Sequence, residues 1–296
     1  MKTQVTCSRL TRSMMLRSLC IIFLAQQAYT QELSYTFTVE KDTFLVGESA
    51  QFEFVISNNS SSSLAVNYPL MDYPENFRLE VVDQLGKTWP YNGHHITEGV
   101  QPVQTVYPGE FLEMNNSLSA WYGERGLRDH LIGVLPPGRY SVGLIYRPND
   151  SGVTFRSPKV NFWVMRPGDS ELKPYDLWMQ YEGILPGTEH KRQTDLLTDL
   201  VDHYRESAYR PAALTRLIYN LVLSEDTSKA RLYLQELLRR YPASIFAWEG
   251  VLRFAWNMNK EQRLTLYRSL AQQYQRTKVG DMLLNEIRLV QRWNSR

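Results

Sequence analysis

The sequence predicts a chain with an all-β half followed by an all-α half. In residues 31–167 apolar and polar residues alternate with a period of two, which is typical of half-buried strands. In residues 168–296 the apolar period becomes helical, and Gly and Pro become scarce. The run Arg166-Pro167-Gly168-Asp169 separates the two patterns. We therefore expect two domains, 31–167 and 168–296, which follow an N-terminal segment, residues 1–30.

The first half contains several short stretches of strict alternation. They are clearest at 51–57, 77–81, 140–146 and 160–164, and runs rich in Gly, Pro, Asn and Ser separate them. About seven or eight short strands spaced in this way favour an antiparallel sandwich over a barrel.

The order of motifs in this half resembles that of bacterial immunoglobulin-like modules. The residues that carry the resemblance are Val46-Gly47-Glu48 before a strand ending at Asn58, Pro108-Gly109-Glu110 in the middle, and the run 135–140 before a late strand. The Cys…Trp…Cys pattern of antibody domains is absent. The resemblance implies an immunoglobulin-like antiparallel β-sandwich, and it specifies a fold without an activity.

The second half predicts a series of helices joined by short loops, as antiparallel helix pairs require. Tyr204, Tyr241 and Tyr274 each close a segment of two apolar and two polar residues, at spacings of 37 and 33 residues. A period near 34 residues with two helices per unit indicates a helical solenoid. The expected helices cover 171–183, 190–207, 211–223, 227–240, 244–257, 260–275 and 278–293.

The middle unit resembles a tetratricopeptide repeat. Ala230, Leu234, Leu237 and Pro242 stand where that family places its small residue, its large apolar residues and its helix-ending proline, and Trp248 stands at the aromatic position of the next unit. The flanking units depart from this pattern. The resemblance implies helical-hairpin repeats of the tetratricopeptide type, and a generic helical bundle is the alternative.

The N-terminal segment has the features of a secretory signal. Four basic residues precede a short apolar run, 19–25, and small residues follow at Ala28 and Thr30. A membrane span needs about 20 apolar residues, which is far longer than this run. We expect cleavage near Thr30, a periplasmic or secreted location, and no membrane span in the mature chain.

Cleavage changes the charge and the cysteine content. The full chain has a net charge of +2, but removal of the four basic residues leaves 29 basic and 31 acidic residues, a net charge of −2. Cys7 and Cys20 leave with the signal, so the mature chain has no disulfide, cysteine nucleophile or thiolate metal site. The loss of the basic excess removes the main argument for nucleic-acid binding.

The sequence carries no catalytic signature. It lacks the phosphate-binding, dinucleotide-binding and nucleophile-elbow motifs. His94, His95 and Glu98 could ligate a metal but fall in a polar stretch between strands, and we interpret them as a loop. The stripe Asp195, Asp199 and Asp202 is interpreted as a solvated helix face, so we expect no enzyme activity, cofactor or metal.

Three functions are compatible with these observations. We favour an exported, non-enzymatic scaffold that binds a protein or peptide partner of unknown identity through a helical-repeat groove and the sandwich. The first alternative is a protease inhibitor that inserts a sandwich loop, with Trp121–His130 as the longest candidate. The second is a carbohydrate-active hydrolase with separated carboxylates such as Asp199 and Glu249.

The repeat pattern also predicts where a groove lies. In stacked helix pairs the first helix of each unit lines the concave face, so 211–223, 244–257 and 278–293 are the expected inner helices. Trp248, Val251, Leu252 and Ala255 form an apolar stripe that we expect in the core. Two alternatives are open: an exposed Glu249–Arg253 ion pair, and a rotated helix with Trp256 in the core. The residues expected to face the groove are Thr215, Tyr219, Phe246, Glu249, Arg253, Trp256, Asn257, Asp281, Asn285 and Arg288.

Overall fold

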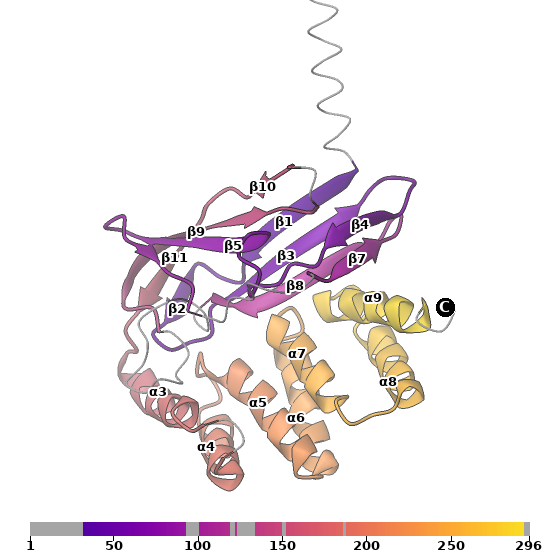
Figure 1. Ribbon diagram of the computed structural model, residues 1–296. Helices are drawn as coiled ribbons and strands as arrows, with labels where there is room; N and C mark the ends of the chain where they lie inside the picture. The colour runs from indigo at the N-terminus through magenta and orange to yellow at the C-terminus, as the bar shows by residue number, and fades with distance from the viewer. Residues whose placement is uncertain are drawn as a thin grey trace, which may run out of the picture.

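The structure is a computed structural model that describes residues 32–92, 101–118, 122, 134–149, 152–185 and 188–292. Within these residues the strands all precede Arg166, and seven helices lie between Asp169 and Arg292. Figure 1 shows the sheets as a layered block, which we call the sheet half, above an arc of helices, which we call the helical half. The expected signal, residues 1–30, lies outside the described part of the chain.

The sheet half contains two packed sheets and a separate strand pair. The first sheet has the antiparallel order β1-β3-β8. The second has the order β2-β11-β9-β5-β6, with β10 beside β9 and a parallel β2–β11 pair, and β4 pairs with β7. The strands are β1 (Leu33–Val39), β2 (Thr43–Leu45), β3 (Gln51–Asn58), β4 (Leu64–Asn67), β5 (Phe77–Asp83), β6 (Thr88–Trp89), β7 (Val103–Val106), β8 (Phe111–Ser117), β9 (Gly138–Tyr146), β10 (Phe155–Arg156) and β11 (Val160–Met165).

The apolar residues of the alternating pattern form the core between the two sheets. Phe52, Phe54 and Ile56 of β3 are fully buried, while Glu53 and Val55 between them point to the opposite face. The ring of Phe54 lies 5.1 Å from that of Tyr146, which joins the sheets across an aromatic core. The opposite face of β3 and β8 is turned toward the helices (Figure 1).

The seven expected helices are present, and two of them end three or four residues earlier than expected. Tyr204 leaves the helical conformation, so the helix expected to reach residue 207 ends at His203. The helix expected to reach residue 257 ends at Phe254, because the next helix starts soon after at a capping box on Asn259. The helices are α3 (Asp169–Glu182), α4 (His190–His203), α5 (Arg210–Leu223), α6 (Thr227–Arg240), α7 (Ile245–Phe254), α8 (Lys260–Gln273) and α9 (Lys278–Arg292).

One apolar core joins the helices. α5 packs against α4, α6 and α7, and α9 packs against α8 and α7. Gly250 of α7 lies so close to α6 that an added Cβ would stand 2.5 Å from a methyl of Leu237. This close approach explains why a glycine is placed in the middle of a helix.

A turn of the sheet half inserts into the helical half. The Trp178 indole donates a hydrogen bond to the carbonyl of Gly47 at 2.8 Å, and the Tyr209 hydroxyl donates to the carbonyl of Val46 at 2.8 Å. Gly47 has a φ of +78° and faces Met179, so neither its backbone conformation nor its surroundings favour a side chain. The β2–β3 turn is therefore fixed between α3 and α5.

A second junction connects β3 and β8 with the last helix, α9. The Lys278 ammonium lies 3.0 Å from the Glu53 carboxylate, and the Asn285 amide donates to the carbonyl of Phe111 at 3.4 Å. These contacts hold α9 beside β8, as Figure 1 shows.

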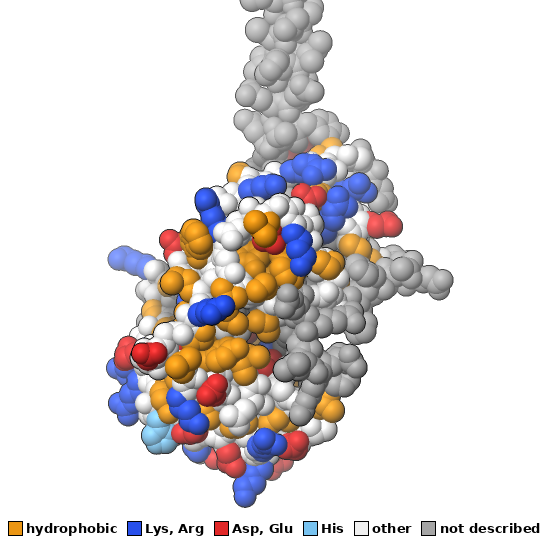
Figure 2. Space-filling model, turned by 90° about the vertical axis from the view of Figure 1, so that its left-hand side faces the viewer, with side chains coloured by type: hydrophobic (Ala, Val, Ile, Leu, Met, Phe, Trp, Pro, Cys, Tyr) orange, Lys and Arg blue, Asp and Glu red, His pale blue; other side chains and the backbone are white. Residues whose placement is uncertain are grey.

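One face of the molecule carries exposed apolar side chains. Figure 2 views the molecule from the side of β11 and α3 and shows such side chains gathered on this face. Trp163 and Met165 of β11 and Leu172 of α3 are each about half exposed. Among the described residues, no helix is both long and apolar enough to cross a membrane.

Candidate functional site

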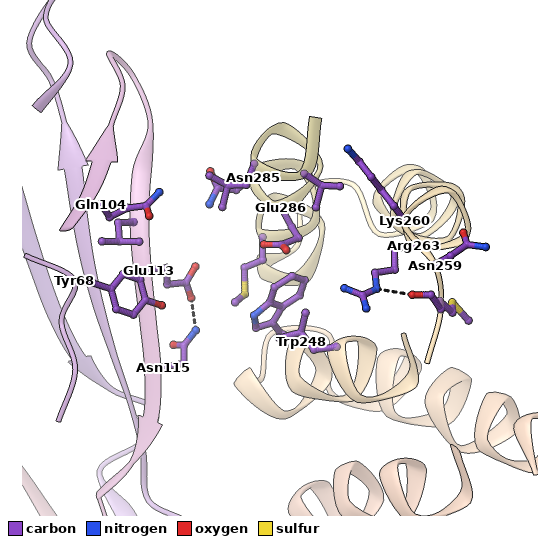
Figure 3. Close-up of a pocket in the computed structure, with 16 residues that line it drawn as sticks. Tyr68, Gln104, Glu113, Asn115, Trp248, Asn259, Lys260, Arg263, Asn285 and Glu286 are labelled. Carbon is purple, nitrogen blue, oxygen red and sulfur yellow. Dashed lines mark hydrogen bonds between the residues drawn. The ribbon is translucent and has the colours of Figure 1, made fainter. Parts of the chain in front are cut away.

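A cleft of about 860 Å³ separates the sheet half from the last three helices (Figure 3). Its sheet wall consists of residues from β8, β7 and the segment after β4. Its helical wall consists of residues from α7, α8, α9 and the loop between α7 and α8. Small-molecule and peptide side-chain sites usually have volumes of about 300–1,000 Å³, so this cleft has the size of a binding site.

The sheet wall presents a partly buried carboxyl group next to an amide. Glu113 accepts a hydrogen bond from the Asn115 amide at 2.6 Å, and both side chains belong to β8. Burial raises the pKa of Glu113 to about 7, and the neighbouring Glu53 adds to this shift while Lys278 and Asn115 oppose it. The Oδ1 atom of Asn115 is buried without a hydrogen-bond partner.

The helical wall presents a second carboxyl group with a raised pKa. Burial raises the pKa of Glu286 on α9, and the charge of Arg263 opposes this shift. Burial also raises the pKa of Tyr68 on the sheet wall, and Glu286 contributes to that shift. Tyr68 and Glu286 therefore interact electrostatically across the cleft. In Figure 3 the carboxyl groups of Glu113 and Glu286 point toward one another from opposite walls.

The floor of the cleft is apolar, and its far rim is basic. Trp248 of α7 packs against Tyr267 at 6.5 Å between ring centroids and turns its indole toward the cleft (Figure 3). Leu252, one turn further along α7, is 36% exposed. Lys260 and Arg263 of α8 form the rim, and the Arg263 guanidinium donates to the carbonyl of Met258 at 2.9 Å.

The expected apolar stripe of α7 divides between the core and the cleft. Val251 and Ala255 are buried as expected. Trp248 and Leu252 instead line the cleft, because the sheet half does not close over this side of α7.

Three of the residues expected in the groove form one cluster. The rings of Tyr219 and Trp256 meet edge to face at 6.0 Å, and the Arg253 guanidinium lies 4.8 Å from the centre of the Tyr219 ring. Trp256 is 55% exposed, so the alternative that places it in the core is wrong. We call Tyr219, Arg253 and Trp256 the aromatic cluster.

Glu249 lies near this cluster in a partly buried position. Burial raises its pKa and Glu40 adds to the shift, whereas the charges of Arg216 and Arg253 oppose it. The structure gives no direct Glu249–Arg253 ion pair among the described residues.

The other residues expected in the groove occupy separate places. Thr215 and Phe246 are buried in the helical half, where the Thr215 hydroxyl donates to the carbonyl of Phe246 at 3.0 Å, so neither faces the surface. Asn285 is buried at the cleft, where it bonds to Phe111. The three exposed residues, which do not line the cleft, are Asn257, Asp281 and Arg288.

The acidic stripe of α4 has local structural roles. Asp199 lies 2.8 Å from His203 of the same helix, and Asp202 accepts a hydrogen bond from the Tyr233 hydroxyl at 3.1 Å. In the described part of the chain no three His, Cys, Asp or Glu side chains form a group that could hold a metal. His94, His95 and Glu98 lie outside that part, as does the segment Trp121–His130 apart from Tyr122.

Sequence reasoning missed most of the cleft. The sheet-wall residues Tyr68 and Glu113 carry no motif, and Asn115 only begins an Asn-x-Ser sequon. They reach the site because α9 packs against β8. Only the neighbourhood of Glu286 was indicated, because this residue directly follows Asn285, which was expected in the groove.

Comparisons with known proteins identify no family. No family model matches the sequence, and no curated protein matches it. Among solved structures, the alkylpurine DNA glycosylase AlkC of Pseudomonas fluorescens aligns at 12% identity and a TM-score of 0.26, over 45% of this chain and 30% of that one. The sporulation control protein Spo0M of Bacillus subtilis aligns at 11% identity and a TM-score of 0.25, over 50% of this chain and 55% of that one.

A third structure covers more of this chain. The α2-macroglobulin of Escherichia coli aligns at 9% identity and a TM-score of 0.27, over 88% of this chain and 22% of that one. This chain spans less than two thirds of each of the three proteins, and likenesses this weak support no functional argument.

Proposed function

We propose that this chain is an exported, non-enzymatic protein that binds a segment of a polypeptide partner in the cleft. In this proposal residues 1–30 are a cleaved signal, the sheet half is an immunoglobulin-like sandwich, and the helical half is a tetratricopeptide-like repeat domain. The partner is a protein or peptide, and the location is the periplasm or the exterior of the cell.

The observation that carries the proposal is the composition of the cleft. An apolar floor that includes Trp248, Leu252 and Met258 lies between a sheet wall with the side-chain amide of Gln104 and a helical wall with that of Asn259. Amides both donate and accept, which suits the alternating N–H and C=O groups of a peptide backbone, and the apolar floor suits its side chains. The binding groove of the proposal is thus shared by both halves.

The aromatic cluster extends this surface. Leu252 lies in the last turn of α7 and is 36% exposed, and Trp256 lies in the turn that follows this helix and is 55% exposed. The Arg263 guanidinium of the cleft rim donates to the carbonyl of Trp256 at 3.3 Å, which places the aromatic cluster beside that rim. Exposed Trp and Arg side chains are the residue types that contribute most to protein interfaces.

A peptide selection tests the proposal. Random heptapeptides displayed on phage are selected on the purified protein, and the most enriched peptide is synthesised with a fluorescent label and titrated by fluorescence polarisation. We expect Leu252→Asp to weaken binding roughly tenfold or more, because it places a charge on the apolar floor. Leu232→Asp is the matched control, since Leu232 is an exposed leucine of α6 that does not line the cleft. Selection of no peptide, or equal weakening by both substitutions, would contradict the proposal.

A further inference from the structure

The sheet wall of the cleft contains a hydrogen-bonded pair, Glu113 and Asn115. The amide nitrogen of Asn115 is used by Glu113, but its Oδ1 is buried and has no partner within the described residues. This oxygen has almost no accessible surface, so the acceptor that the sheet wall presents to the cleft is the Glu113 carboxyl group.

Two carboxyl groups face one another across the cleft. Glu113 and Glu286 come from β8 and α9 and point toward one another (Figure 3). Neither forms an ion pair with a lysine or arginine among the described residues. Burial disfavours the charged form of both, and a cation between them would offset that effect.

The cations that act electrostatically on these two carboxyl groups are held by other partners. The Lys278 ammonium is 3.0 Å from Glu53. The Arg263 guanidinium donates to the carbonyls of Met258 and Trp256, at 2.9 and 3.3 Å. The charge of Lys278 lowers the pKa of Glu113, and the charge of Arg263 lowers that of Glu286. Neither cation forms an ion pair with that carboxyl group among the described residues.

The surroundings favour an organic cation over a metal ion. Hard metal ions require about six oxygen ligands, and the described residues provide no cluster of three suitable side chains. The indole of Trp248 lies next to Glu286 in Figure 3, and an aromatic face attracts ammonium and guanidinium groups.

We infer that the cleft binds the side-chain cation of one lysine or arginine of the partner polypeptide, between Glu113 and Glu286 and beside Trp248. This inference rests on the proposed polypeptide binding and specifies its ligand. Lys260 and Arg263 on the far rim repel further positive charge, so the cleft selects a single basic residue rather than a basic run.

The peptide selection, carried out at pH 8 where Glu113 is mostly ionised, provides the first measurement. We expect one enriched position occupied by Lys or Arg. The double variant Glu113→Gln/Glu286→Gln should lose this preference. Glu261→Gln, an exposed glutamate of α8 outside the cleft, should keep it.

Titration of one matched pair of peptides provides the second measurement. The selected peptide is compared with a copy in which citrulline replaces arginine, or norleucine replaces lysine. The neutral copy should bind the wild-type protein roughly tenfold more weakly or worse, because a charge-assisted hydrogen bond is lost. The double variant should bind both peptides equally well, which shows that the carboxyl groups recognise the charge.

The outcomes separate this inference from the proposed function. Peptides whose binding requires Leu252 but which show no basic preference would overturn the cation site and leave polypeptide binding intact. A basic preference that persists in the double variant would also overturn the cation site. Selection of no peptide at all would contradict the proposed function itself.

Discussion

Glu113 lies where β8, α9 and the cleft meet, and its ionisation links the stability of the molecule to pH. Its carboxyl group faces Glu53, Lys278, Asn115 and the cleft, and its pKa is about 7 in the folded protein against 4.5 for the free side chain. Folding therefore favours the protonated form. The favourable contribution of the protonated carboxyl group to the free energy of unfolding is complete at pH values below the unfolded pKa. It is lost as the pH rises through about 7.

Replacement of Glu113 by Gln should stabilise the protein at pH 8 and not at pH 4. The wild-type carboxylate is charged and poorly solvated at pH 8, whereas glutamine carries no charge at any pH. We expect the free energy of unfolding to rise by on the order of 2 kcal/mol at pH 8, measured by urea denaturation. Glu261→Gln serves as an exposed control. An equal effect of Glu113→Gln at both pH values would contradict the assigned shift.

The α8–α9 turn determines where the last helix lies. The Thr277 hydroxyl donates to the carbonyl of Tyr274 at 2.8 Å and accepts from the N–H of Gly280 at 3.3 Å. A Cβ on Gly280 would collide with the same Tyr274 carbonyl, which is backbone and cannot rotate away. The turn thereby fixes the start of α9, and with it Lys278, Asn285 and Glu286.

Gly280→Ala should lower the free energy of unfolding by about 1–3 kcal/mol. Alanine normally stabilises a helix by up to about 1 kcal/mol relative to glycine, so a net loss shows that the collision dominates. Urea denaturation measures the change. The control is Gly168→Ala, where an added Cβ meets nothing within 4 Å. A Gly280→Ala protein as stable as the wild type would contradict the tight turn.

The individual elements could be predicted from sequence, but their docking could not. Alternation placed the strand around Phe54, and helical periodicity placed α7 around Val251, because these patterns are local consequences of which face is buried. The cleft depends on contacts such as Asn285 to Phe111, which are 174 residues apart and leave no periodic signal. For this reason Leu252 was expected in the core of the helical half and in fact lines a space between the halves.

At the scale of the whole molecule, the two halves are linked by side chains that act as parts of both. The hydroxyl of Tyr209 belongs to the helical half but completes the hydrogen bonding of Val46 in the sheet half, and Trp178 does the same for Gly47. We therefore expect the two halves to unfold together.

Tyr209→Phe should lower the free energy of unfolding by about 1–3 kcal/mol, because the carbonyl of Val46 loses its donor. Far-ultraviolet circular dichroism and tryptophan fluorescence should report one coincident transition in the wild type. Tyr219→Phe is the matched control, since no hydrogen bond of its hydroxyl occurs within the described residues. Two separate transitions in the wild type would show that the link is weak.

The inserted β2–β3 turn also has a consequence for the order in which the molecule assembles. Trp178 and Tyr209 follow their partners on the turn by 131 and 163 residues, so the ribosome completes the turn long before either donor exists. Domains generally fold as units from the N-terminus during synthesis, which lets the sheet half present a finished turn around which α3 and α5 then pack. A circular permutant that starts at Gly168 would reverse this order, and its helices would have to form before the turn that fills the space between them.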